Sequence, residues 1–120
     1  MQWSFTDERP IYAQLVEQLK LRIVTGLYPP GSRVSAVREL AAEAAVNPNT
    51  MQRALAALEE QGLVYSQRTA GRFVTDDTER ISRERRALAS GKIRRFLDEM
   101  GSLGFEKKEI LELLEEEENE

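Results

Sequence analysis

The fold of this chain is constrained most strongly by one change in its hydrophobic period. Through the first 61 residues, apolar side chains recur every three or four positions, which is the spacing of amphipathic helices. Residues 63–67 and 72–75 are instead short runs of β-type residues. The four residues that join them end in Gly71, which suits a turn with a positive φ. This order predicts a mainly α fold with one small β-hairpin.

Capping residues set the expected bounds of the three helices. The first helix is predicted over residues 10–25, where it starts at a proline and stops before a glycine. Ser35 is expected to cap a second helix over residues 36–45. Asn47, followed by a proline, is expected to cap a third helix over residues 48–61.

Two further helices are predicted in the rest of the chain. We expect Asp76 or Thr78 to begin a long helix, and residues 106–117 to form a last one. Three helices followed by a hairpin is the order of a winged helix-turn-helix, which we place at residues 9–76. Residues 77–120 then form a two-helix C-terminal dimerisation segment.

The apolar stripes of this tail predict that the chain forms a homodimer. They recur at helical spacing, but the tail has no third helix that could cover them. A second copy of the tail can cover them by two-fold symmetry. The side chains expected at the dimer interface are Ile81, Leu88, Ile93, Phe96, Leu97, Met100, Ile110, Leu113 and Leu114.

Missing residue types argue against an enzyme. The 120 residues include no cysteine and no histidine, which removes disulfides, zinc sites built on these residues and Ser-His-Asp triads. Glycine-rich phosphate-binding loops are absent as well. We therefore expect no catalytic residue, no metal and no cofactor. We also expect a cytoplasmic protein without a membrane partner, because the sequence lacks a secretory signal and a long apolar run.

Charge is distributed unevenly along the chain. The net charge of −4 would by itself argue against a nucleic-acid partner. Residues 1–75, however, hold 8 Lys and Arg against 7 Asp and Glu, a net charge of +1. Residues 76–120 hold 9 against 14, a net charge of −5. DNA binding depends on the local patch, so the overall acidity does not exclude it.

Six short motifs follow one another within residues 9–76. They are Pro10-Ile11-Tyr12-Ala13-Gln14-Leu15, Gly26 with Pro30-Gly31, Val37-Arg38-Glu39-Leu40-Ala41, Val46-Asn47-Pro48-Asn49-Thr50, Arg53-Ala54-Leu55 with Leu58-Glu59 and Gly62-Leu63, and Gly71 with Phe73-Val74. In this order and spacing they resemble the GntR family of bacterial transcription regulators. The tail, with Leu103-Gly104-Phe105 and residues 108–114, is similar to the C-terminus of the small YtrA-like subfamily.

The resemblance implies a sequence-specific DNA-binding transcription regulator. We expect a repressor that binds an inverted-repeat operator in double-stranded DNA as a homodimer. One alternative stays open, namely a winged-helix adaptor that binds other proteins and does not read DNA. The acidic balance and an altered wing favour that alternative. Nothing in the residues identifies a small-molecule effector.

The expected DNA contacts begin with the third helix, which would enter the major groove. Arg53 can grip guanine or hold a phosphate, while Gln52 and Asn49 can reach adenine or a phosphate. Thr50 offers a hydroxyl to a phosphate and a methyl group to thymine. Without DNA, the same residues would form a solvated helix face. The resemblance extends the expected DNA-binding set to Tyr12, Ser35, Arg38, Asn47, Arg68, Gly71 and Arg72.

Alternatives remain for several of these residues. Arg38 could form a surface ion pair with a neighbouring glutamate, and Tyr12 could pack partly into the core. Arg68 and Arg72 could enter the minor groove, meet phosphates or edge a solvated hairpin. The sequence also departs from the family pattern. Residues 34–36 are Val-Ser-Ala where Leu-Pro-Ser is usual, and the wing tip lacks the usual Gly-Lys-Gly-Thr.

Overall fold

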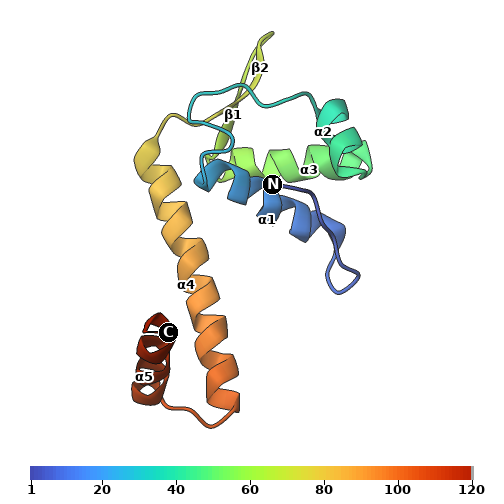
Figure 1. Cartoon of the computed structure of the whole chain (residues 1–120). Coiled ribbons are helices and arrows are strands. Elements are labelled where there is room, and N and C mark those ends of the chain that lie inside the picture. Colours follow the sequence, from blue (N-terminus) through green and yellow to red (C-terminus); the bar gives the residue numbers. More distant parts are fainter. Residues whose placement is uncertain (120) are drawn as a thin grey trace. The chain divides into compact units, whose positions relative to one another are not determined.

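The computed structural model describes residues 1–119 and confirms the mainly α fold with one antiparallel hairpin (Figure 1). Its elements in chain order are α1 (Ile11–Val24), α2 (Val37–Ala44), α3 (Pro48–Glu60), β1 (Val64–Gln67), β2 (Gly71–Val74), α4 (Thr78–Ser102) and α5 (Lys107–Glu118). The chain forms two compact units, the first over Met1–Arg85 and the second starting at Arg86. Glu120, the last residue of the predicted tail, lies outside the described residues.

The core of the first unit lies between α1 and α3. Leu15, Leu19 and Ile23 of the predicted α1 stripe are buried, whereas Ile11 in the first helical turn is exposed. α1 packs against α3, and the other large buried side chains of this core come from α2, α3 and the residues of or just before the hairpin: Leu40, Met51, Leu55, Leu58, Leu63, Val64 and Val74. Helical periodicity therefore identified the face on which α1 packs.

The starts of α2 and α3 follow different rules. The prediction that Ser35 caps α2 is wrong, because the helix begins at Val37 and Ala36 occupies the cap position without a side-chain bond. The hydroxyl of Ser35 lies one residue too early for a cap. The cap of α3 is confirmed, since Oδ1 of Asn47 accepts a hydrogen bond from the backbone N–H of Asn49 at 2.7 Å.

The cap of α4 also differs from the prediction. Oδ1 of Asp77 accepts a hydrogen bond from the N–H of Arg80 at 3.1 Å, so Asp77 takes the role expected of Asp76 or Thr78. The first turns of α4 belong to the first unit, where Ile81 is buried and Glu84 pairs with a lysine of α1. None of the helices in the described residues combines the length and apolar character that a membrane span requires.

The hairpin is tied to the connection between α1 and α2. Gly71 has a φ of +103°, as predicted, and it pairs with Gln67 at the turn. The N–H of Val34 donates to the carbonyl of Arg72 at 2.9 Å, so residues of the connection extend the outer edge of β2. These hydrogen bonds fix the base of the wing against the helical core.

The first nine residues lie along α1, which the sequence pattern did not predict (Figure 1). The side-chain amide of Gln14 exchanges hydrogen bonds with the backbone of Thr6 at 2.8 and 2.9 Å. Arg22 is only 2% exposed, and its guanidinium lies 3.5 Å from the centroid of the Trp3 ring. Burial lowers the pKa of this arginine, because desolvation disfavours its charged form.

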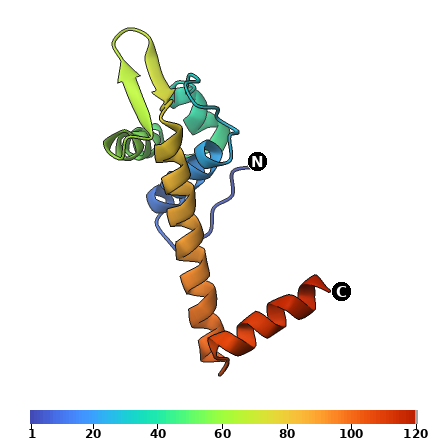
Figure 2. The ribbon, with the colours of Figure 1, turned by 90° about the vertical axis from the view of Figure 1, so that its left-hand side faces the viewer.

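The second unit contains the later part of α4 and all of α5. Helical hydrogen bonding in α4 continues through Ser90 and Gly91, where the sequence would permit a kink. A capping box starts α5, in which the N–H of Glu106 donates to the carboxylate of Glu109 at 3.0 Å. Figure 2 shows α5 leaving the end of α4 at an angle.

Candidate nucleic-acid interface

The exposed side of α3 carries the polar residues expected at the DNA. Met51, Leu55 and Leu58 anchor the opposite side of the helix in the core. Asn49 and Gln52 are exposed, as is Arg53, while Thr50 is half-buried. A helix fixed along one side and polar along the other presents its polar side to a groove of DNA without rearranging.

Arg53 is positioned by an aromatic ring of α1. Its guanidinium carbon lies 4.4 Å from the centroid of the Tyr12 ring, and Tyr12 itself is half-buried. Tyr12 thus packs partly into the molecule and also lies beside Arg53 on the exposed side of α3. A cation over an aromatic face is worth about 0.5–1 kcal/mol at an exposed site, enough to favour one orientation of the arginine. Arg53 forms no ion pair within residues 1–119.

Arg38 is exposed near the start of α2. Among the described residues it forms no ion pair, so the predicted alternative of a pair with Glu39 or Glu43 is not observed. Ser35 is exposed on the connection that precedes α2. The side chains of Arg38 and Ser35 are therefore both available to a ligand. They lie on or next to α2, which packs against α3.

The two wing arginines are in different surroundings. Arg68 is exposed in the turn between the strands. Nε of Arg72 lies 3.4 Å from Oε1 of Glu59 on α3, and its Nη1 lies 3.5 Å from Oε1 of Gln52. The hydroxyl of Ser66 on β1 donates to the same Glu59 oxygen at 2.7 Å. Arg72 is therefore turned toward α3 and only Arg68 extends at the wing tip.

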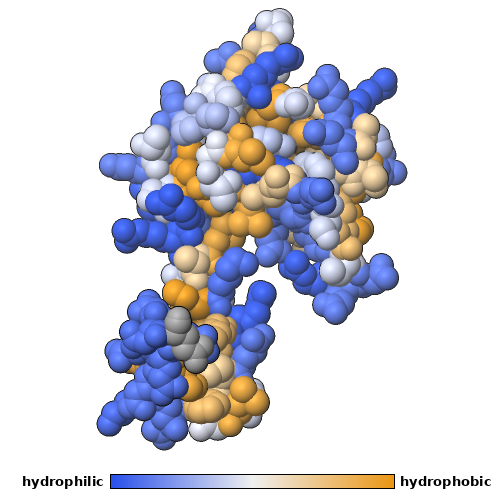
Figure 3. All heavy atoms as spheres, viewed as in Figure 1, coloured by the Kyte–Doolittle hydropathy of each residue, from blue (hydrophilic) through white to orange (hydrophobic). Residues whose placement is uncertain are grey.

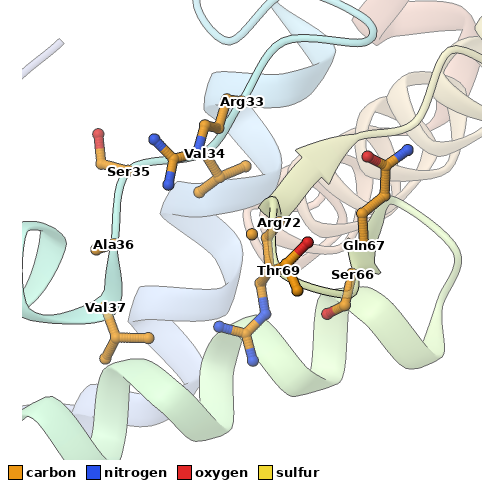
Figure 4. Close-up of a pocket in the computed structure, with 10 residues that line it drawn as sticks. Arg33, Val34, Ser35, Ala36, Val37, Ser66, Gln67, Thr69 and Arg72 are labelled. Carbon is orange, nitrogen blue, oxygen red and sulfur yellow. The ribbon is translucent and has the colours of Figure 1, made fainter.

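A groove of about 400 Å³ separates the wing from the connection before α2 (Figure 4). Arg33 lies on one side of it, and its Nε donates to the carbonyl of Ala70 at 3.2 Å. The guanidinium passes so close to Gly71 that a Cβ there would lie 3.2 Å from Nε. Sequence reasoning missed both Arg33 and Glu59. Their partners lie in other elements, and only the alternation of Arg33 with buried Val34 hinted at its outward position.

Comparison with known proteins decides the family. The family model described as "Bacterial regulatory proteins, gntR family" matches residues 11–74, which is more than half of the chain. The chain belongs to the GntR family. This GntR-family chain is a DNA-binding transcription regulator and not an enzyme, which decides against the adaptor alternative.

Two similar proteins differ in how much of this chain they match. The HTH-type transcriptional regulator YhcF of Bacillus subtilis is 34% identical over 91% of this chain and 90% of its own length. The HTH-type transcriptional repressor YtrA of Bacillus subtilis is 35% identical over 57% of this chain and 52% of its own length. Similarity to the first relative therefore includes most of the tail, and similarity to the second covers about half of each protein.

Solved structures agree with this assignment. A GntR family transcriptional regulator from Listeria monocytogenes superimposes with a TM-score of 0.87 and 39% identity, over 93% of this chain and 98% of that one. The DNA-binding domain of AraR, solved in complex with operator ORE1, superimposes with a TM-score of 0.53 and 31% identity, over 62% of this chain and 94% of that domain. The winged helix-turn-helix with C-terminal helices is confirmed.

The eight cations within residues 1–75 of this GntR-family chain fall into two groups. Arg9 pairs with Glu17 at 2.9 Å, Lys20 pairs with Glu84 at 3.1 Å, and Arg22 is buried. These three cations are committed within the fold. The other five lie on the connection, α2, α3 and the wing, and they are Arg33, Arg38, Arg53, Arg68 and Arg72. Two of these five are also engaged, because Arg72 pairs with Glu59 and Arg33 donates to the carbonyl of Ala70. The same elements also carry four glutamates, Glu39, Glu43, Glu59 and Glu60, so their net charge is +1. A positive patch on them would therefore depend on where the arginines lie and not on the net charge.

The tail of the GntR-family chain has an apolar groove between α4 and α5. The groove has a volume of about 470 Å³ and is lined by Ile93, Phe96, Leu97, Lys107, Ile110, Leu111 and Leu114. Of the nine side chains predicted at a dimer interface, Ile81 and Ile110 are buried within the single chain and have little surface left to offer a partner. Leu88, Leu97, Met100 and Leu113 are half-buried, and the other three are exposed. Figure 3 shows apolar atoms at the surface of this unit among charged ones.

Carboxylates of the described residues do not gather into a metal site. No group of three or more Asp and Glu side chains within residues 1–119 is arranged to hold an ion. The acidic residues of the site are instead used in protein contacts, as Glu59 shows by accepting from Ser66 and Arg72.

Proposed function

We propose that this chain represses transcription by binding, as a homodimer, to an inverted-repeat operator. The exposed side of α3 is the observation that carries the proposal. It combines an arginine positioned by Tyr12 with a glutamine and an asparagine, the side chains that best discriminate guanine and adenine in the major groove. The proposed contacts include Arg38, Arg68 and the other exposed cations of the first unit, which would hold phosphates on either side.

The apolar groove of the tail supports the homodimer. Ile93, Phe96, Leu111 and Leu114 are all exposed by more than a third, although the groove that they line is apolar. Covering a half-exposed side chain of this size contributes about 1 kcal/mol, so eight of them in a dimer contribute about 8 kcal/mol before the cost of association. A second copy of the tail can cover all of these side chains together, because a two-fold interface repeats each contact.

Two-fold symmetry also determines the form of the operator. Each protomer presents one α3, so a symmetric dimer reads the same bases twice in opposite directions. The operator is then an inverted repeat whose half-sites are spaced by about one helical turn or a multiple of it. Where such an operator overlaps a promoter, the bound dimer would exclude polymerase, and the similar YtrA protein is named a repressor. A regulator of this kind acts where the DNA is, so we propose the cytoplasm as its location.

Selection from random double-stranded DNA tests the proposal. The full chain should enrich a palindromic sequence, and footprinting should protect two half-sites. Placing that sequence between a promoter and its start site should lower transcription in vitro in proportion to occupancy. An Arg53→Ala variant, which should fold normally, is the matched control and should need a protein concentration roughly 5- to 150-fold higher for the same repression. Enrichment of a single half-site would contradict the dimer, and binding without any sequence preference would contradict readout by α3.

A further inference from the structure

One carboxylate and one arginine connect the wing to the reading side of α3. Oε1 of Glu59 accepts from the hydroxyl of Ser66 at 2.7 Å and lies 3.4 Å from Nε of Arg72. Nη1 of Arg72 then reaches Oε1 of Gln52, two helical turns before Glu59, at 3.5 Å. Figure 4 shows the side chain of Arg72 turned away from the wing tip and toward α3. The contacts join α3, β1 and β2 through side chains alone.

The arrangement is more than a mobile surface pair. The side chain of Arg72 is only 20% exposed, and its partner oxygen is held by a second hydrogen bond from Ser66. Partial shielding from water strengthens an ion pair. Because Ser66 already restrains the carboxylate of Glu59, less side-chain entropy is lost when Arg72 pairs with it. The backbone of Arg72 is also fixed, because its carbonyl accepts from Val34 in the connection before α2. Arg72 is therefore held from both its backbone and its side chain.

This arrangement determines which atoms Gln52 can offer to DNA. A glutamine with both amide groups free forms two hydrogen bonds with adenine, accepting from N6 and donating to N7. The amide oxygen of Gln52 lies beside the guanidinium of Arg72 at 3.5 Å, and no hydrogen bond within residues 1–119 engages the NH₂ group of Gln52. An NH₂ group only donates, so it suits O6 of guanine or O4 of thymine and does not suit the N6 donor of adenine, whereas the N7 acceptor is common to both purines.

We propose that Arg72 and Glu59 are positioning residues that make Gln52 a hydrogen-bond donor, and that they thereby shift its base preference from adenine to guanine or thymine. The inference rests on the proposed function, since it requires α3 to read base edges. It assigns to Arg72 a role in sequence preference, whereas an arginine that only met phosphates would strengthen binding to every sequence alike.

Selection from random DNA with matched wing variants separates these roles. Gln52→Ala first identifies the base pair that Gln52 reads, as the position at which preference is lost. Arg72→Met keeps the aliphatic stem and removes the guanidinium, and it should raise the share of adenine at that position relative to guanine and thymine by about fivefold or more. Glu59→Gln should shift the preference in the same direction. Arg68→Met removes the other wing arginine and should weaken binding without changing the preference.

Three results would overturn the proposal. The first is an unchanged base preference in Arg72→Met with affinity lowered on all sequences, which would make Arg72 a phosphate contact. The second is an equal shift in Arg68→Met, which would trace the effect to charge alone. The third is a shift that persists when Arg72→Met is added to Gln52→Ala. Failure of the proposed function looks different, because the unaltered chain would then select no sequence at all. Thermal melting of each variant confirms that the readout comes from folded protein.

Discussion

Replacing Phe96 by alanine tests the dimer through the groove of the tail. Phe96 is 38% exposed in the single chain, so roughly that share of its surface is available for a partner to cover. Complete burial of a phenylalanine side chain contributes about 3 kcal/mol, and covering the exposed share therefore contributes about 1 kcal/mol. Because a symmetric dimer holds two copies of the residue, the variant should lose about 2 kcal/mol of association free energy, or about 30-fold in Kd.

Sedimentation over a range of protein concentrations measures this Kd directly. Leu103→Ala is the matched control, since Leu103 is 72% exposed in the same unit but does not line the groove. It should leave the Kd within about threefold of that of the unaltered chain. Equal Kd values for the unaltered chain and Phe96→Ala would refute the reasoning. A chain that stays monomeric at high micromolar concentration would do the same.

Four other predictions concern the first unit and its ligands. Arg53→Ala should weaken binding to the selected operator by about 1–3 kcal/mol in a gel-shift titration, and Tyr12→Leu by about 0.5–1 kcal/mol, with melting of Arg53→Ala unchanged. Arg38→Ala should lower the slope of log affinity against log salt by about one if Arg38 holds a phosphate, and an unchanged slope and affinity would exclude the contact. Trp3→Ala should lower the free energy of unfolding by about 1–2 kcal/mol, because it removes the ring that lies over the guanidinium of Arg22. Arg22→Met should leave that free energy nearly unchanged or raise it, as measured by urea titration. Exhaustive dialysis against a chelator should leave operator affinity unchanged, and its loss would show a metal requirement.

The sequence was sufficient to predict the fold where local rules act alone. The α1 stripe is a property of spacing, and Leu15, Leu19 and Ile23 are buried as their spacing predicts. Asn47 before a proline and Gly71 in a turn each satisfy a backbone requirement within a few residues. Such features need no knowledge of distant parts of the chain.

Prediction failed where adjacent residues are alternative helix caps, and where the partner of a side chain is distant in the sequence. Three possible caps follow one another at residues 76–78, and a shift of one position decides that Asp77 takes the role. Arg22 interrupts an apolar helix face, and its burial depends on the return of the N-terminal segment along α1, where Trp3 lies over its guanidinium and the carbonyl of Met1 accepts from it. The direction of Arg72 depends on the register of the hairpin against α3, which no local pattern specifies.

Predictions for the site divide in the same way. The exposed polar side of α3 could be placed from periodicity, because exposed and buried positions alternate around a helix of known pitch. Its supporting contacts could not, since Tyr12 lies beneath Arg53 only because α1 packs on α3. The two wing arginines also differ for a reason that lies outside the local sequence. Arg68 is exposed, whereas Arg72 pairs with Glu59 because the hairpin packs beside α3.

The glutamates along α5 also affect how the chain encounters DNA. Glu112 and residues 115–118 are all exposed, so this helix repels the phosphate backbone, while the exposed arginines of the first unit are attracted to it. An approach of α5 to DNA is therefore unfavourable at low salt, and encounters through the exposed arginines are the favourable ones. This difference fades at ionic strengths where screening reaches only a few ångströms.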